Sequence, residues 1–172
     1  MVLEKFGEYC IRTVDSSDVE KVYEMRKRVC TESDTVLSSP EEITFDKMKS
    51  WIENWKDNPT KLFAVVEYEG EIVGQLWCWF IDNKIKLSHI VEFGLEIVSE
   101  HQNKGLGTKL CEIAVKWAKS KGAKRLQAET LEKNIPMRKI LENFEFELEG
   151  KMVAYLKNGD KFEDVVIYGK IF

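Results

Sequence analysis

A strand-like run that leads into a glycine-containing loop and then into a long helix is the feature that most constrains this chain. Residues 91–98 are mostly apolar and residues 99–104 are polar. Gly105 and Gly107 then open an amphipathic stretch that extends to about Lys121. A glycine-flanked turn at a helix start leaves several backbone N–H groups unpaired, with the positive end of the helix dipole behind them. This arrangement suits a phosphate or diphosphate group.

The composition is that of an ordinary globular protein and argues against several functional classes. The net charge of −4 disfavours a nucleic-acid-binding role, which requires a basic face. No stretch approaches the roughly 18 apolar residues that a membrane span needs, and the first residues lack signal-peptide architecture. The four cysteines include no Cys-x-x-Cys pair, so we expect reduced, mostly buried thiols in a cytoplasmic protein. We expect no nucleic acid, membrane or metal ion among its partners.

The chain contains no linker, internal repeat or low-complexity tract, so residues 1–172 are expected to form one domain. Strand-like and helical periodicities follow one another in the order βααβββαβαββ. This order predicts an α/β fold with a mixed sheet and helices on both faces. The predicted strands cover residues 9–14, 61–68, 71–80, 91–98, 125–131, 146–156 and 162–171. The predicted helices cover the segment from the capping residues 15–18 to about residue 29, then residues 45–55, 105–121 and 136–143.

Two common nucleotide-binding motifs fit the glycine loop poorly. A Rossmann dinucleotide site requires Gly-x-Gly-x-x-Gly directly after a strand, and here the third glycine position is Leu110. A P-loop requires Gly-x-x-x-x-Gly-Lys-Ser/Thr, which residues 105–109 do not supply. A tight strand-to-helix connection without a ligand is an alternative for a Gly-x-Gly turn alone. The preceding Gln-Asn-Lys, residues 102–104, favours a ligand site.

Residues 102–107, Gln-Asn-Lys-Gly-Leu-Gly, match the Q/R-x-x-G-x-G/A motif of the GCN5-related N-acetyltransferase (GNAT) superfamily. The order of the predicted elements resembles this superfamily over nearly the whole chain, and Asn134 with residues 140–150 resembles its later motif. Residues 162–169 are similar to the ribosomal-protein N-terminal acetyltransferases and their small-molecule relatives, among them the phosphinothricin-type enzymes. The resemblance implies a GNAT-like, mostly antiparallel sheet of about seven strands and an acetyl-CoA-dependent acyltransferase.

In this superfamily the loop wraps the pyrophosphate of acetyl-CoA, and the pantetheine arm pairs with the exposed backbone of the preceding strand. The physical chemistry of the loop agrees, because glycines let the backbone approach closely and free amides neutralise phosphate charge. Asn134 matches a family asparagine near the pantetheine, and a helix N-cap is an equally good interpretation of it. The resemblance implies that acetyl-CoA, as co-substrate, contacts Leu95, Ile97, Val98, Gln102, Asn103, Lys104, Gly105, Leu106, Gly107, Thr108 and Asn134.

Acetyl transfer to an amine requires removal of a proton from the amine, stabilisation of the thioester oxygen and departure of a thiolate. Glu129 matches the base position of the N-terminal acetyltransferases, and Glu92 matches that of the phosphinothricin-type enzymes. We place Glu129 first, Glu92 second and Glu96 a distant third. At least one of them is expected to be an ordinary exposed or ion-paired carboxylate. The backbone N–H near Val98 would polarise the thioester carbonyl, as the family geometry implies.

Three positions depart from the superfamily's pattern. Leu141 stands where a general-acid tyrosine is frequent, Glu145 replaces a glycine, and Met137 replaces a small hydroxyl residue. A CoA thiolate is a fair leaving group unaided, since thiols ionise at about pH 8.5. Tyr155 or Tyr168 could supply a proton instead, although a buried core role is the default for both. The departures also leave open a catalytically weak CoA-binding regulatory module.

The sequence therefore predicts an N-acetyltransferase that acts on a primary amine by direct attack in a ternary complex. The acceptor is a small-molecule amine or the N-terminus of a protein or peptide, and a homodimer is left open. We expect residues 31–40, the helix with Trp51 and Trp55, and the closing hairpin to shape the acceptor site. Trp77 and Trp79 share one strand face and could line a pocket, although packing on the sheet is their default role.

Overall fold

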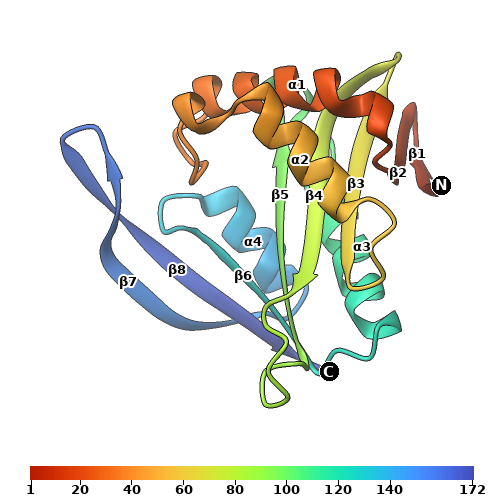
Figure 1. Cartoon of the computed structure of the whole chain (residues 1–172). Helices are drawn as coiled ribbons and strands as arrows, with labels where there is room; N and C mark the ends of the chain where they lie inside the picture. The colour runs from red at the N-terminus through yellow and green to blue at the C-terminus, as the bar shows by residue number, and fades with distance from the viewer.

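Continuous buried runs form the central strands β3 (Lys61–Tyr68) and β4 (Glu71–Phe80) of this protein, and alternating buried and half-buried residues form strands such as β6 (Arg125–Leu131). A computed structural model, which describes all residues from 1 to 172, arranges these strands in one eight-stranded sheet (Figure 1). The spatial order is β1-β2-β3-β4-β5-β6-β8-β7, and only the β5–β6 pair is parallel. The strands are β1 (Val2–Phe6), β2 (Tyr9–Thr13), β3 (Lys61–Tyr68), β4 (Glu71–Phe80), β5 (Ile90–Ile97), β6 (Arg125–Leu131), β7 (Glu147–Asn158) and β8 (Lys161–Ile171). The helices are α1 (Val19–Glu32), α2 (Phe45–Trp55), α3 (Leu106–Ser120) and α4 (Ile135–Asn143).

The predicted fold class is confirmed, with one strand more than the sequence suggested. The additional strand is β1, which pairs with β2 through a two-residue turn that begins at Gly7. Gly7 has a φ of +59°, a conformation that favours glycine. β1 was not predicted because it lies at the edge of the sheet and is largely exposed, so its five residues carry little hydrophobic pattern. α1 also extends three residues beyond its predicted end near Val29.

Each helix buries an apolar stripe against the sheet. α1 and α2 cover one face, and α3 with α4 covers the other (Figure 1). Val22 and Val29 of α1 are buried, as are Leu110 and Ala114 of α3. This spacing places apolar side chains on one side of each helix, so the core forms two layers that sandwich the sheet.

The thiols are free, and three of the four cysteines are buried, with Cys10 partly exposed. This agrees with the expectation of mostly buried, reduced cysteines. None of the helices is long and apolar enough to cross a membrane.

The sheet opens between its two parallel strands. β5 and β6 pair only from Ile90 to Glu92, which lie opposite Arg125 to Gln127. Beyond Glu92, β5 stays paired with β4, while β6 stays paired with β8. The two strands therefore separate toward their carboxyl ends, and the loop after β5 and helix α4 after β6 lie on either side of the gap.

The packing at Gly94 provides a test of this sheet. Gly94 lies opposite Trp77 in the β4–β5 register, and a Cβ at Gly94 would overlap the Trp77 indole. The indole cannot easily move, because it packs edge-on against Trp51 with ring centroids 5.7 Å apart. We expect Gly94→Ala to lower the free energy of unfolding by about 1–3 kcal/mol through overpacking, measured by urea denaturation.

Gly150→Ala is the matched control, because a Cβ at Gly150 of β7 meets no atom within 4 Å. Equal stabilities of the two variants would show that Trp77 does not occupy the space above Gly94.

Candidate active site

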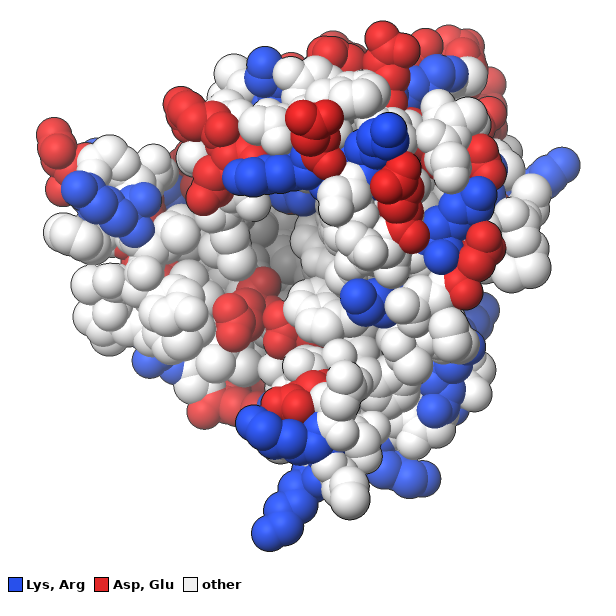
Figure 2. All heavy atoms as spheres, viewed as in Figure 1, with Lys and Arg blue, Asp and Glu red and all other residues white.

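The separation of β5 and β6 opens a cavity of about 940 Å³. Its walls come from the C-terminal half of α1 with the loop that follows it, from β4 and β5, from the glycine loop before α3, from the end of β6 and from α4. Figure 2 shows this hollow in the middle of one face, with acidic side chains gathered along one side of it. The predicted binding loop and two of the three predicted carboxylates, Glu96 and Glu129, thus surround one space.

One edge of β5 offers free backbone groups to this cavity. The N–H of Val98 donates to the carbonyl of Val73 at 3.0 Å. Hydrogen-bonded pairs alternate in an antiparallel ladder, so in this register the N–H groups of Leu95 and Ile97 point away from β4. They point toward the gap, where β6 no longer pairs. An extended ligand that carries amides can pair with this edge, whereas the N–H of Val98, expected to polarise a carbonyl, is already used.

The glycine loop presents its amides to the same cavity. None of the N–H groups of residues 103–108 donates to an acceptor within the chain. Gly105 forms the N-cap of α3 with a φ of +83°, and Asn103 also has a positive φ of 58°. These left-handed residues turn successive N–H groups to one side, and the dipole of the 15-residue helix adds to their field. The loop therefore has the geometry of an anion site.

The loop is held in place by other parts of the chain. The amide nitrogen Nε2 of Gln102 donates to the carbonyl of Ile97 at 2.9 Å, which ties the loop to the end of β5. A Cβ at Gly105 would lie 3.2 Å from the ring of Phe6, and a Cβ at Gly107 would lie 2.8 Å from Cδ1 of Ile140. Both glycines therefore pack closely against other parts of the chain, Gly105 against β1 and Gly107 against α4.

Asn134 occupies the N-cap of α4 and also lines the cavity. Its Oδ1 accepts a hydrogen bond from the N–H of Met137 at 3.3 Å. The N-cap interpretation is confirmed, and the side chain remains beside the space that the predicted ligand would fill. Among the other predicted cofactor-binding residues, Val98 and Leu106 are buried in the core and Lys104 is exposed outside the cavity. Those that line the cavity are Leu95, Ile97, Gln102, Asn103, Gly105, Gly107 and Thr108.

The three candidate carboxylates lie in different environments. Glu129 lines the cavity at the end of β6 and forms neither a hydrogen bond nor an ion pair with another side chain. Glu92 lies outside the cavity lining and accepts a hydrogen bond from Nε2 of Gln127 at 2.8 Å. Burial raises the pKa of the Glu92 carboxyl; the hydrogen bond from Gln127 offsets part of the rise, and the charge of Glu129 adds to it.

Glu96 lines the cavity but is almost fully buried, with 7% of its surface exposed. Its Oε1 lies 3.2 Å from Nη2 of Arg26, and its Oε2 accepts from Nε2 of Gln75 at 2.7 Å. Burial raises the pKa of the Glu96 carboxyl, while the charge of Arg26 and the bond from Gln75 oppose the rise. Both oxygens are thus engaged, as expected for the ion-paired member of the three glutamates.

Residues 20–146 of the chain match the acetyltransferase (GNAT) family. The chain belongs to this family. The predicted class, an acyltransferase, is confirmed, and the alternative of a catalytically weak regulatory module is not favoured because the relatives are named as acetyltransferases.

The similarity extends along most of the chain. An L-amino acid N-acetyltransferase from Escherichia coli (strain K12) is 23% identical over 159 residues, covering 90% of this chain and 93% of that protein. A putative ribosomal protein bS18-alanine N-acetyltransferase from Bacillus subtilis (strain 168) is 24% identical over 151 residues, covering 87% and 89%. The solved structure of a putative acetyltransferase from Salmonella typhimurium with its cofactor acetyl-CoA superposes with a TM-score of 0.84 at 18% identity, covering 96% and 94%.

This acetyltransferase departs from its family at two positions with structural consequences. Glu145 stands where the family has a glycine, and it adopts a φ of +60°, so the chain accepts strain there that glycine would avoid. Leu141 stands where a general-acid tyrosine is frequent and is fully buried in the core.

No tyrosine replaces that acid in the cavity. The hydroxyl of Tyr168 donates to Oε1 of Glu142 at 2.9 Å and accepts from Nε of Arg138 at 3.1 Å. Neither Tyr168 nor Tyr155 lines the cavity. No tyrosine lines the cavity of this acetyltransferase.

The sequence analysis did not single out Arg26, which lines the end of the cavity beneath α1. A signal for it exists in the sequence. Arg26 falls four residues after Val22 and three before Val29, so it stands within the apolar stripe of α1. A charged residue at such a position is either paired in the interior or functional.

The interaction between Glu129 and Glu92 generates a prediction about titration. Because the charge of Glu129 helps to raise the pKa of Glu92, Glu129→Gln should lower the pKa of Glu92 toward its ordinary value, with the rise due to burial remaining. Carboxyl carbon chemical shifts followed by NMR over a pH titration would measure it.

Glu132→Gln is the matched control, because Glu132 follows the same strand but pairs with Lys151 at 2.8 Å outside the cavity. An unchanged pKa of Glu92 in Glu129→Gln would mean that the two carboxylates do not interact.

Proposed function

We propose that this protein transfers the acetyl group of acetyl-CoA to a primary amine, by direct attack within a ternary complex. The observation that carries the proposal is a single cavity bordered by the free amides of residues 103–108, the free edge of β5 and the unpaired carboxylate of Glu129. Membership in the acetyltransferase family and relatives named for the acetylation of amino groups support it.

The chain's own groups fit acetyl-CoA in two places. The amides of residues 103–108, with the α3 dipole behind them, suit the diphosphate. The N–H groups of Leu95 and Ile97 suit the amide carbonyls of the pantetheine arm, which would lie along β5 like an added strand. The thioester would then lie in the gap between β5 and β6, and Asn134 would border the arm from the start of α4.

The proposed transfer needs only one protein base to account for the two protons that the amine nitrogen loses. Glu129, directly or through one water, takes a proton from the substrate ammonium and later releases it to solvent. The amine nitrogen then forms a bond to the thioester carbonyl carbon, and the carbon–sulfur bond breaks. The CoA thiolate leaves with the bonding electron pair and takes up the second proton that the nitrogen loses. The products are the N-acetylated amine and free CoA thiol.

Glu129 is the base in this proposal because it is the only one of the three glutamates that both lines the cavity and has no hydrogen-bond or ion-pair partner. The Glu96 oxygens are occupied by Arg26 and Gln75, and Glu92 lies behind the cavity lining. Glu92 is the second candidate, since burial raises the pKa of its carboxyl and so makes its carboxylate a stronger base.

The proposed function is tested by measuring thiol release from acetyl-CoA with panels of amino acids, polyamines and peptides that carry a free N-terminus. Turnover with at least one primary amine is expected. No turnover with any of them, despite measured CoA binding, would overturn the proposal.

Substitution of the proposed base should affect chemistry rather than binding. We expect Glu129→Gln to lower kcat/KM by about 10²–10⁴-fold, the usual contribution of a general base, with an unchanged CoA dissociation constant. Glu132→Gln should retain the activity of the unmodified protein. A Glu129→Gln variant with full activity would remove Glu129 from the mechanism and leave Glu92 to be tested in the same way.

Substitution in the glycine loop should have the opposite effect. Gly105→Ala introduces a Cβ at a φ of +83° and 3.2 Å from the Phe6 ring, so the loop must shift and its amides lose their alignment. We expect the CoA dissociation constant to rise by about tenfold or more, equivalent to roughly 1.4 kcal/mol, in isothermal titration calorimetry.

Gly122→Ala is the matched control at the other end of α3. It carries a similar φ of +77°, and its Cβ would meet no atom within 4 Å. Both variants introduce a similar backbone strain, so equal CoA affinities would show that residues 103–108 do not bind the coenzyme.

A further inference from the structure

We propose that Arg26 binds the carboxylate of the acceptor, so that the amine acetylated belongs to a free amino acid. This inference rests on the proposed function and narrows its acceptor to a zwitterion with its ammonium and carboxylate on one small molecule. It excludes polyamines, which lack a carboxylate, and peptide N-termini, in which an amide stands in its place.

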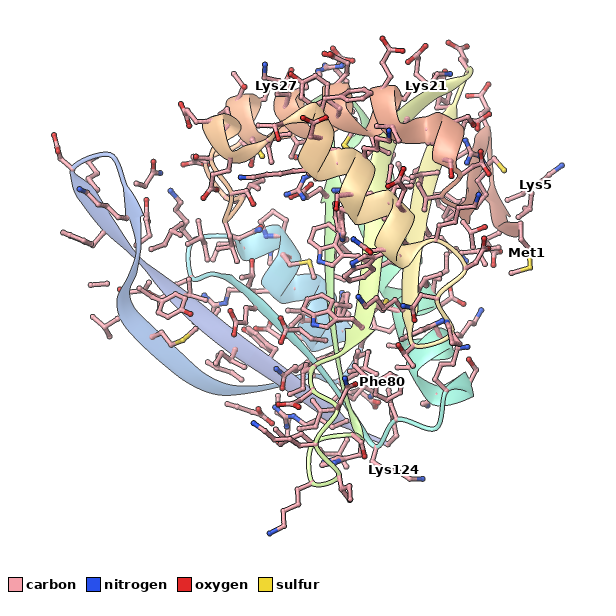
Figure 3. All side chains as sticks on the ribbon, viewed as in Figure 1. Met1, Lys5, Lys21, Lys27, Phe80 and Lys124 are labelled. Atoms are coloured by element: carbon pink, nitrogen blue, oxygen red, sulfur yellow. The ribbon has the colours of Figure 1, made fainter.

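The fold places Arg26 in the wall of the cavity. It lies on the sheet-facing side of α1 and is 8% exposed. The next residue, Lys27, lies on the outer side of the same helix, away from the sheet (Figure 3). A buried guanidinium is costly unless its charge is compensated, so the fold must hold Arg26 there through specific contacts.

Those contacts orient the guanidinium without using most of its donors. The planes of Trp51 and Trp77 lie beside it, with their centroids 5.1 Å and 5.7 Å from Cζ. Its hydrogen bonds within the chain, to Glu96 at 3.2 Å and to Ser38 at 3.3 Å, both come from Nη2. Arginine has five N–H donors on three nitrogens, so most of this fork is unused.

The remaining nitrogens differ in access. Nε is fully buried and has no partner in the chain. Nη1 also makes no hydrogen bond in the chain but is not among the fully buried atoms. Because Arg26 is otherwise enclosed and lines the cavity, we place the access to Nη1 on the cavity side. A rigid guanidinium with free donors toward a cavity is suited to a planar carboxylate.

The other charges of the cavity favour a zwitterion. Two lysines also line the cavity. Lys133 is held by Asp34 at 3.0 Å and Glu163 at 2.8 Å, so its charge is already neutralised. Lys139 of α4 is exposed, so its charge is solvated. Glu129 is unpaired and can receive an ammonium. Arg26 supplies donors for a carboxylate. Because Glu96 balances part of the charge of Arg26, the site favours a monoanion over a phosphate dianion. One cavity therefore offers a partner for each pole of an amino acid.

The contacts of Arg26 favour a free carboxylate over a continuing chain. Arg26, Trp51 and Trp77 pack against one another beneath α1. A peptide acceptor bound with its first carbonyl at Arg26 would have to lead its second residue past these two indoles. A free amino acid ends at the guanidinium.

The decisive experiment compares amino acids with their α-amides, which keep the shape and the amine but lack the negative charge. For alanine, leucine, methionine and phenylalanine, at least one acid should show a kcat/KM about 10²-fold above that of its amide, since a buried charged partner left unpaired is costly. Arg26→Gln should remove this preference, mainly by raising KM for the acid, with CoA affinity unchanged.

Arg28→Gln is the matched control on the same helix, because Arg28 pairs with Glu32 and Glu100 on the exposed side and does not line the cavity. It should keep the acid-over-amide preference. Arg26→Gln leaves Glu96 without its charged partner, so the double variant Arg26→Gln/Glu96→Gln keeps the pair neutral and guards against unfolding. Thermal unfolding and CoA affinity report whether each variant is folded.

The outcomes separate the two proposals. An amide or a peptide acetylated as well as the amino acid, or turnover with polyamines only, would overturn the role of Arg26 while the proposed function stands. Acid preference that persists in folded Arg26→Gln would also overturn it. Failure of every amine would instead overturn the proposed function. Should neither Arg26 variant fold, the acid-to-amide ratio of the unmodified protein still decides the carboxylate requirement.

Discussion

The separation of two parallel strands after three residue pairs determines most of what this protein can do. β5 and β6 part at Glu92, yet each remains fully paired on its other side, with β4 and β8 respectively. The sheet therefore opens without unravelling. The opening leaves the inner edge of β5 unsatisfied, and buried backbone N–H groups require partners. The free N–H groups of Leu95 and Ile97 are thus available to the extended ligand that we propose, and the cavity follows directly from the pairing pattern.

The anion-binding loop depends on parts of the chain that lie far away in sequence. Gly105 packs against Phe6 of β1, and Gly107 packs against Ile140 of α4. The Nδ1 of His101 lies 3.0 Å from the hydroxyl of Tyr9 in β2. Support on both sides holds the loop amides in one orientation. A flexible loop would instead lose conformational entropy each time it bound an anion. The N-terminal hairpin thus supports the loop that we propose binds the coenzyme.

The sequence predicted the elements whose signals are local. β6 and α3 were placed to within a residue or so because glycines mark their ends and apolar residues recur with a clear period. β1 was missed because an exposed edge strand has no such period. Arg26 was missed because the residues that hold it, Trp77 and Glu96, are brought to it only by the tertiary fold. For the same reason the sequence could rank Glu129 and Glu96 as bases but could not tell which one is paired.

The cavity contains carboxylates but no tyrosine acid. The costs of the two proton transfers in the proposed reaction, deprotonation of the amine and departure of the thiolate, explain why this combination is sufficient. Removing a proton from the α-ammonium of a free amino acid, with a pKa of about 9.5, costs roughly 3.4 kcal/mol at pH 7. Expelling a thiolate with a pKa of about 8.5 costs roughly 2 kcal/mol under the same conditions. Deprotonation of the amine is thus the more costly of the two steps, so a base contributes more than an acid. The proposed base Glu129, which is unpaired in the cavity, would assist this deprotonation. With Leu141 buried at the position expected for an acid, only the easier departure of the thiolate would proceed without a proton donor.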